Sequence, residues 1–142
     1  MSRPYLSKTK RRRIFFVARN RCGYCLTAQE YSGAQLQIDH IVPLIKGGAN
    51  EEENLWLACS WCNSYKGAQV DGIDPFTGKT VPLFNPRRQN WLEHFTWSDD
   101  GTKIIGRTPT GRTTVDVLQL NNEFIIPARR RWVSAGWHPP SD

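Results

Sequence analysis

The 142-residue sequence predicts a small α+β protein in which a zinc site of four cysteines staples a strand-loop-strand-helix unit. Two Cys-x-x-Cys pairs, at 22–25 and 59–62, have the spacing of metal-binding turns. Between them, residues 36–44 and 54–58 carry the apolar pattern of two strands joined by a Gly-Gly loop. A helix is predicted to follow the second pair, from residue 61 to about residue 68.

A basic helix is predicted before this unit, over residues 8–19 and ending near Asn20. The formal net charge is +6, and eight of the 19 Lys and Arg residues lie within the first 21 positions, which contain no acidic residue. Such a local cluster is typical of a surface that binds phosphate backbones, and the alternative is a solvated terminus. The candidate nucleic-acid contacts are Lys10, Arg11, Arg12 and Arg13.

The C-terminal part is predicted to support the unit with a hairpin and helices. Residues 71–86 are rich in Gly, Pro and Asp and indicate a loop, and residues 91–106 indicate a hairpin around Ser98-Asp-Asp-Gly101. Thr113-x-x-Asp116 indicates a helix start, and a last helix is expected with Pro127 in its first turn and its end at Gly136. We expect parts 1–21, 22–70 and 71–142 to form one compact domain.

The cysteines themselves predict a structural zinc ion, with Cys22, Cys25, Cys59 and Cys62 as ligands. Four protein ligands leave no open position for a reacting water molecule, so this ion is not expected to be the catalytic one. Disulfides or free core thiols are the alternative. They fit less well, because no signal peptide or membrane-spanning stretch is apparent and a cytoplasmic location is expected.

Between the two pairs lies a candidate catalytic cluster. Asp39 and His40 are adjacent in the first predicted strand, so their side chains should point to opposite faces. Asn63 follows Cys62 at the start of the helix, where zinc would fix its position. Carboxylate and amide oxygens suit a hard cation such as Mg²⁺.

Together, Asp39-His40, Asn54 and Cys62-Asn63-x-x-Lys66-Gly67 resemble the HNH endonucleases, whose core is the ββα-metal finger. The resemblance covers roughly residues 20–70. The last histidine of the family motif is replaced here by Asn63, as in zinc-bound phage nucleases that resolve DNA junctions.

The resemblance implies that His40 is the general base and that Asp39 and Asn63 hold one Mg²⁺ or Mn²⁺ ion. It also implies that Asn54 fixes the loop and the imidazole. Lys66 is either a phosphate contact or an ordinary solvated lysine. The implied reaction is hydrolysis of DNA, with nicking by a monomer and double-strand cleavage by a dimer. RNA as a substrate and a non-catalytic zinc module that binds nucleic acid are the alternatives.

Several other residues carry no clear chemistry. His94 and His138 are expected to be packing or surface residues. The tryptophans of the C-terminal part are expected in its core, with base stacking as the alternative. For Arg129, Arg130 and Arg131, the sequence leaves phosphate contact and a solvated helix face equally open.

Overall fold

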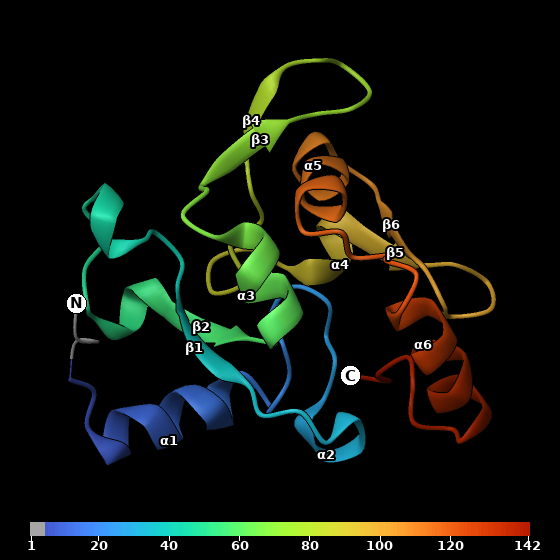
Figure 1. The fold of residues 1–142 in the computed structure, drawn as a ribbon, viewed down its shortest axis with the longest axis horizontal. Coiled ribbons are helices and arrows are strands. Elements are labelled where there is room, and N and C mark those ends of the chain that lie inside the picture. The colour runs from blue at the N-terminus through green and yellow to red at the C-terminus, as the bar shows by residue number, and fades with distance from the viewer. Residues whose placement is uncertain (1–4) are drawn as a thin grey trace.

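The computed structural model describes residues 5–142. Over these residues the chain forms three two-stranded antiparallel sheets, with short helices packed around them (Figure 1). The predicted α+β class is confirmed. Within the described part of the chain, no helix combines the length and apolar character that a bilayer crossing requires.

The basic segment forms helix α1, Lys8–Val17, as predicted but two residues shorter. Ser7 caps its start by accepting a hydrogen bond from the Lys10 amide at 3.2 Å. The helix ends because Arg19 and Asn20 take left-handed φ values of 58° and 55°. Arg3, which belongs to the same basic cluster, lies outside the described residues.

The predicted strand pair is confirmed as β1, Gln37–His40, and β2, Leu55–Ala58. The first strand is shorter than the predicted 36–44, because the chain bends after His40 and enters a 3₁₀ turn at Leu44. They pair antiparallel, with Asp39 opposite Trp56 and His40 opposite Leu55. Helix α3, Ser60–Lys66, packs on both strands, and α1 packs on β2 (Figure 1). The remaining elements of this half are α2 at Gln29–Ser32 and the 3₁₀ turns η1 at Leu44–Lys46 and η2 at Glu52–Asn54.

The expectation of a plain loop over residues 71–86 is wrong. This segment contains a hairpin of β3, Asp71–Ile73, and β4, Thr80–Pro82. Three-residue strands are too short to show an apolar alternation in the sequence. Their turn is organised by the buried Asp74, whose carboxylate accepts two hydrogen bonds from Arg112 at 3.1 and 2.9 Å.

The second predicted hairpin is confirmed, although its first four residues form a helical turn. The turn is α4, Trp91–His94, and it leads into β5, Phe95–Trp97, which pairs with β6, Ile104–Gly106. The His94 imidazole shares a hydrogen bond with the Thr108 hydroxyl at 2.7 Å and packs against Phe84. Its position fits the packing role expected for it.

Two helices complete the chain. The predicted start of the first at Thr113 is wrong, because Thr108 caps it and α5 runs over Pro109–Val117. Thr113 is fully buried inside the helix. The last helix, α6, occupies Ile125–Ser134 with Pro127 in its first turn, and Gly136 follows at a φ of 80°. This agrees with the prediction.

One cluster of buried side chains joins the N-terminal and C-terminal parts. Trp91 is 9% exposed, and its indole nitrogen donates to the Tyr24 carbonyl at 2.9 Å. His138 is buried against Trp97, and burial lowers the pKa of His138 to about 4. By contrast, Trp137 is 56% exposed, so not every tryptophan is in the core. The division at residues 21 and 70 stays a prediction.

Candidate active site and zinc centre

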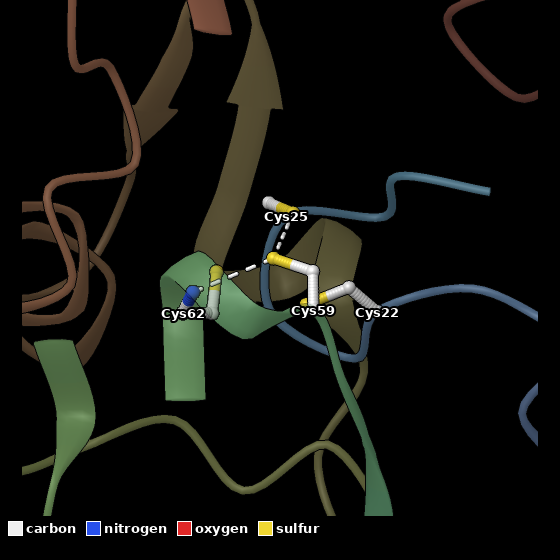
Figure 2. Close-up of side chains that lie close together, drawn as sticks. All are labelled: Cys22, Cys25, Cys59 and Cys62. Carbon is white, nitrogen blue, oxygen red and sulfur yellow. Dashed lines mark hydrogen bonds between the residues drawn. The ribbon is translucent and has the colours of Figure 1, made fainter. Parts of the chain in front are cut away.

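The four cysteines converge from two separate loops, as predicted (Figure 2). One pair lies in the turn after α1. In the other pair, Cys59 caps α3 and accepts a hydrogen bond from the Cys62 amide at 3.4 Å. All four sulfur atoms lie within 4.8 Å of one another, and Cys25 and Cys59 are 3.7 Å apart without a disulfide. A tetrahedral zinc site with bonds of about 2.3 Å spaces its sulfurs by about 3.8 Å, so the cluster has the geometry of such a site.

The chemistry of the cluster also fits a cation. Burial raises the pKa of the Cys22 thiol well above its ordinary value, and hydrogen bonds with the other thiols raise the pKa of Cys62. Hydrogen bonds with the other thiols lower the pKa of Cys25. Protein groups alone therefore stabilise one thiolate at the expense of its neighbours. Four thiolates together require a divalent cation, and zinc is the usual one for this ligand set.

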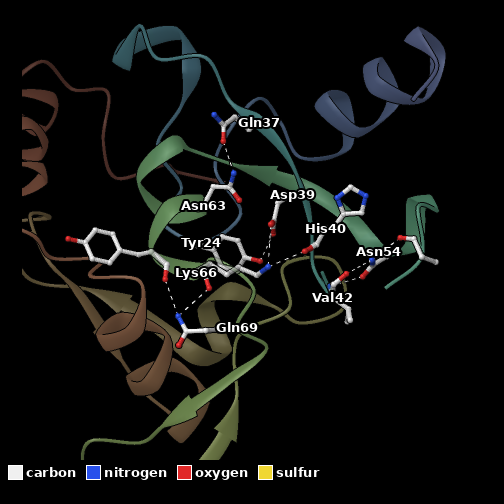
Figure 3. Close-up of polar contacts among 11 residues, drawn as sticks. Tyr24, Gln37, Asp39, His40, Val42, Asn54, Asn63, Lys66 and Gln69 are labelled. Atoms are coloured by element: carbon white, nitrogen blue, oxygen red, sulfur yellow. Dashed lines mark hydrogen bonds and ion pairs between the residues drawn. The ribbon is translucent and has the colours of Figure 1, made fainter. Parts of the chain in front are cut away.

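Asp39 is 4% exposed and is held by two side chains (Figure 3). The Tyr24 hydroxyl donates to Oδ2 at 2.8 Å, and the Lys66 ammonium lies 3.3 Å from Oδ1. Burial raises the pKa of Asp39, while the charge of Lys66 and the hydrogen bond from Tyr24 oppose that rise. Tyr24 belongs to the first cysteine turn, so it connects the zinc centre directly to this carboxylate.

The His40 side chain points away from Asp39, as the strand period predicts (Figure 3). Its imidazole meets Asn50 in the loop between β1 and β2. Its Nε2 lies 3.0 Å from Asn50 Oδ1. The Asn50 amide is oriented by its other end, where Nδ2 donates to the Tyr5 carbonyl at 3.1 Å. An amide oxygen only accepts, so His40 Nε2 carries the proton and Nδ1 is free to accept one.

Asn54, the last residue of η2, closes the same loop. Its side chain accepts from the Val42 amide at 2.8 Å and donates to the carbonyls of Val42 and Ala49, both at 2.9 Å. Gly48 is required here, because a Cβ at this position would lie 1.7 Å from the Val42 carbonyl oxygen. Asn54 therefore braces the loop that carries Asn50, and it is Asn50 that contacts the imidazole.

Asn63 lies in the first turns of α3, and its Nδ2 donates to Gln37 Oε1 at 2.7 Å (Figure 3). Gln37 and Asp39 share one face of β1, and Asn63 and Lys66 share one face of α3. The strand and the helix are thus joined by two neighbouring side-chain pairs, Gln37 with Asn63 and Asp39 with Lys66. This arrangement brings the predicted cation ligands, Asp39 and Asn63, to one side of the sheet.

The predicted nucleic-acid contacts lie in two places: four are on helix α1, and Lys66 is in the protein interior. Arg11 and Arg12 are exposed on α1, and Arg13 forms an ion pair with Glu52 through its Nε at 2.8 Å. Lys10, on the same helix, is half-buried.

Lys66 is 2% exposed, and its ammonium also donates to the His40 carbonyl at 3.0 Å. The position of Lys66 does not fit either a phosphate contact or a solvated lysine, because both of its partners are inside the protein.

Sequence reasoning missed three supporting residues: Tyr24, Gln37 and Asn50. Tyr24 carried a signal, since it stands inside the first Cys-x-x-Cys pair. Gln37 stands two residues before Asp39 and therefore on the same strand face. Asn50 had no signal beyond its place in a polar loop, because its contact depends on how that loop folds back over β1.

Comparison with known proteins agrees with this geometry. Residues 22–69 match the family model of the HNH endonucleases. Over 121 residues the chain is 25% identical to the Septu protein PtuB of Bacillus thuringiensis. The match covers 84% of this chain and 42% of that protein, so the chain spans less than half of the relative's length. No solved structure matches the chain significantly.

The matched segment is the unit built by β1, β2 and α3 between the two cysteine turns. It contains Asp39, His40 and Asn63 as well as the four-cysteine cluster. Residues 22–69 of this chain are therefore an HNH endonuclease domain.

Proposed function

We propose that this chain is a metal-dependent endonuclease that hydrolyses phosphodiester bonds in DNA. The observation that carries the proposal is His40, whose free Nδ1 is set by the contact of Nε2 with Asn50. This nitrogen lies on a strand whose neighbouring side chain is a buried carboxylate, within a domain of a nuclease family. A non-catalytic zinc module needs no such arrangement.

In the proposed reaction, His40 Nδ1 takes a proton from a water molecule as the water oxygen attacks the phosphorus atom. The bond between phosphorus and the 3′ oxygen breaks, and the departing 3′ oxygen takes a proton from solvent, which leaves a 5′-phosphate and a 3′-hydroxyl. Histidine is the side chain that most often serves as a general base. Asn50 keeps the imidazole in the required tautomer, and Asn54 keeps the loop of Asn50 in place.

Asp39 and Asn63 are the proposed ligands of a Mg²⁺ or Mn²⁺ ion. A carboxylate and an amide oxygen are hard donors that fit such an ion. Among the described residues, Asn63 Oδ1 takes no protein hydrogen bond, because Nδ2 is the atom that bonds Gln37. When bound, the ion would supply positive charge opposite the charge that develops on the phosphate and on the leaving oxygen. Tyr24 and Lys66 hold the Asp39 carboxylate in place.

Zinc at Cys22, Cys25, Cys59 and Cys62 is proposed to be structural. It fixes both ends of the domain, so that Tyr24 on one side and Asn63 on the other keep their positions relative to β1. Contact with DNA is proposed for Lys10, Arg11, Arg12 and Arg13 of α1. Tyr5, just before this helix, already touches Asn50, so α1 leads directly to the proposed catalytic loop.

One observation favours the alternative, a non-catalytic zinc module. Asp39 already has a full-charge partner in Lys66, and a carboxylate so paired has a structural role without any metal. The two functions differ in whether Asp39 ever binds a cation. They therefore predict different responses to Mg²⁺.

The test is incubation of the purified chain with supercoiled plasmid, with and without Mg²⁺, followed by separation of nicked and linear DNA. We expect cleavage only with the metal. Nicked product alone indicates one active site acting at a time, and linear product at early times indicates a dimer. A parallel reaction on single-stranded and duplex RNA tests the substrate. Tight DNA binding without cleavage under any of these conditions would favour the non-catalytic module.

A further inference from the structure

Arg129, in the middle of α6, is fully buried. Its guanidinium donates to the carbonyls of Thr102 and Leu120, at 3.0 and 2.7 Å, and to the Asn121 side chain at 3.2 Å. These partners are neutral. No carboxylate of residues 5–142 lies within ion-pair distance of it, and its Nε has no hydrogen-bond partner there.

A buried guanidinium without a counter-charge is costly, since an unpaired ion loses its hydration without gaining an opposite charge. The neighbouring arginines of α6 avoid this cost, because Arg130 and Arg131 are exposed. Neither alternative that the sequence left open for Arg129, phosphate contact or a solvated face, fits its burial. The Trp97 ring, whose centroid lies 5.4 Å from Arg129 Cζ, offsets part of this cost through a cation-π contact but carries no net charge. A negative charge nearby would offset the rest.

Cysteine thiolates that hold zinc would supply this negative charge. Arg129 lines a small cavity of about 130 Å³ together with Cys25, Cys59 and Cys62. Four thiolates with one Zn²⁺ carry a net charge of −2, so the cluster needs positive charge as much as Arg129 needs negative charge.

We propose that Arg129 is the counter-ion of the four-cysteine zinc centre. Its side chain extends from α6, far along the chain from the HNH domain, and balances part of the centre's charge across the shared cavity. Its hydrogen bonds to Thr102 and Leu120 fix the guanidinium there. The C-terminal helix thereby becomes a positioning element for zinc. The inference depends on zinc at the four cysteines and is independent of nuclease activity.

The test measures zinc affinity by competition with a chelator at fixed pH for three variants. Arg129→Met removes the charge and keeps the length, Arg129→Lys keeps the charge, and Arg130→Met is the matched exposed control. Removing a group that supports metal ligands from outside typically weakens metal binding by about 10- to 100-fold, and we expect this for Arg129→Met. Arg129→Lys should stay close to wild type, and Arg130→Met should match it.

Circular dichroism with excess zinc establishes that each variant is folded before the affinities are compared. A folded Arg129→Met protein with unchanged zinc affinity would overturn the proposal. If Arg129→Met does not fold even with excess zinc, Arg129→Lys decides the question. A lysine variant that folds and holds zinc supports the role of charge. One that loses zinc shows that the hydrogen bonds to the carbonyls matter instead, and the proposal fails.

Discussion

The four-cysteine cluster and the proposed catalytic cluster lie in the same HNH domain, but they depend on different kinds of contact. Each pair of cysteines comes from one short turn, so local spacing alone brings its sulfurs together. Asp39, His40 and Asn63 instead depend on Tyr24, Asn50 and Gln37, which are not among the residues on which the resemblance to the family rests. We therefore expect changes at the cysteines to affect the whole fold. Changes at the proposed catalytic cluster should instead lower the rate of DNA cleavage, by an amount that differs from residue to residue.

The largest effect is expected at the zinc centre. Cys59→Ser removes a ligand, and structural zinc contributes about 10–16 kcal/mol of apparent binding energy to the folding of small domains. The variant should lose zinc, by elemental analysis, and its folded structure, by circular dichroism. Ser60→Ala, the adjacent exposed position in α3, is the control and should keep both. A folded Cys59→Ser protein would show that the buried core holds the domain without the metal.

At the catalytic cluster, His40→Ala should lower the cleavage rate by about 10²–10⁴-fold, the usual contribution of a general base. Folding and DNA binding should be preserved, because the imidazole is half-buried and, among residues 5–142, makes one hydrogen bond, to Asn50. Plasmid cleavage and a gel-shift assay measure the two properties. Equal cleavage by the variant and the wild type would move the base to another residue.

Asn63 tests the proposed metal site by changing its donor atom. Asn63→Ala should abolish cleavage, and Asn63→Asp should retain it because the oxygen donor remains. Asn63→His should extend activity toward Ni²⁺, because imidazole suits later transition metals. Rates with Mg²⁺, Mn²⁺, Ni²⁺ and Zn²⁺ give the comparison. Normal cleavage by Asn63→Ala would reduce Asn63 to a residue that joins α3 to Gln37.

A smaller effect on the cleavage rate is expected at Asn50, which acts through His40. Asn50→Ala removes one hydrogen bond to the imidazole, worth about 0.5–1.5 kcal/mol, so the rate should fall by about 2- to 10-fold. Combining it with His40→Ala should add little, because Asn50 acts through His40. Full additivity of the two effects in plasmid cleavage would contradict the assigned tautomer.

The smallest effect concerns the basic helix. Replacing Lys10–Arg13 by alanine should weaken binding equally for unrelated DNA sequences. It should also flatten the salt dependence, with the slope falling by about 0.9 for each phosphate that the helix no longer neutralises. Arg13 should contribute least, since it already pairs with Glu52. Lys103 and Arg130, exposed in the C-terminal part, are the controls. An unchanged salt slope would make α1 a solvated helix with no role in binding.

The same contrast explains what the sequence could predict. The cysteine cluster and the β1–β2–α3 unit follow from spacing and local pattern. The roles of Asn50 and Arg129 do not, because their contacts form only when a loop or the C-terminal helix folds back on the domain. Lys66 shows the same limit. Its place on the Asn63 face of α3 was predictable, but that face packs on β1, where Asp39 pairs with the buried ammonium.

The predicted start of α5 was wrong for a different reason. Both Thr108-Pro109 and Thr113-x-x-Asp116 have the chemistry of a helix start. Thr108 prevails because its side chain caps the Gly111 amide at 3.0 Å, while the fully buried Thr113 packs inside the helix. Local patterns therefore indicate more than one start, and tertiary packing selects between them.

The central claim is that zinc shapes the domain while a separate hard cation serves cleavage. The most direct measurement follows zinc content and plasmid cleavage in the same sample after brief treatment with EDTA and then addition of Mg²⁺. We predict that one zinc per chain survives the treatment, that cleavage stops, and that Mg²⁺ restores it. Cleavage that continues without Mg²⁺ while zinc is retained, or that returns only with added zinc, would contradict the claim.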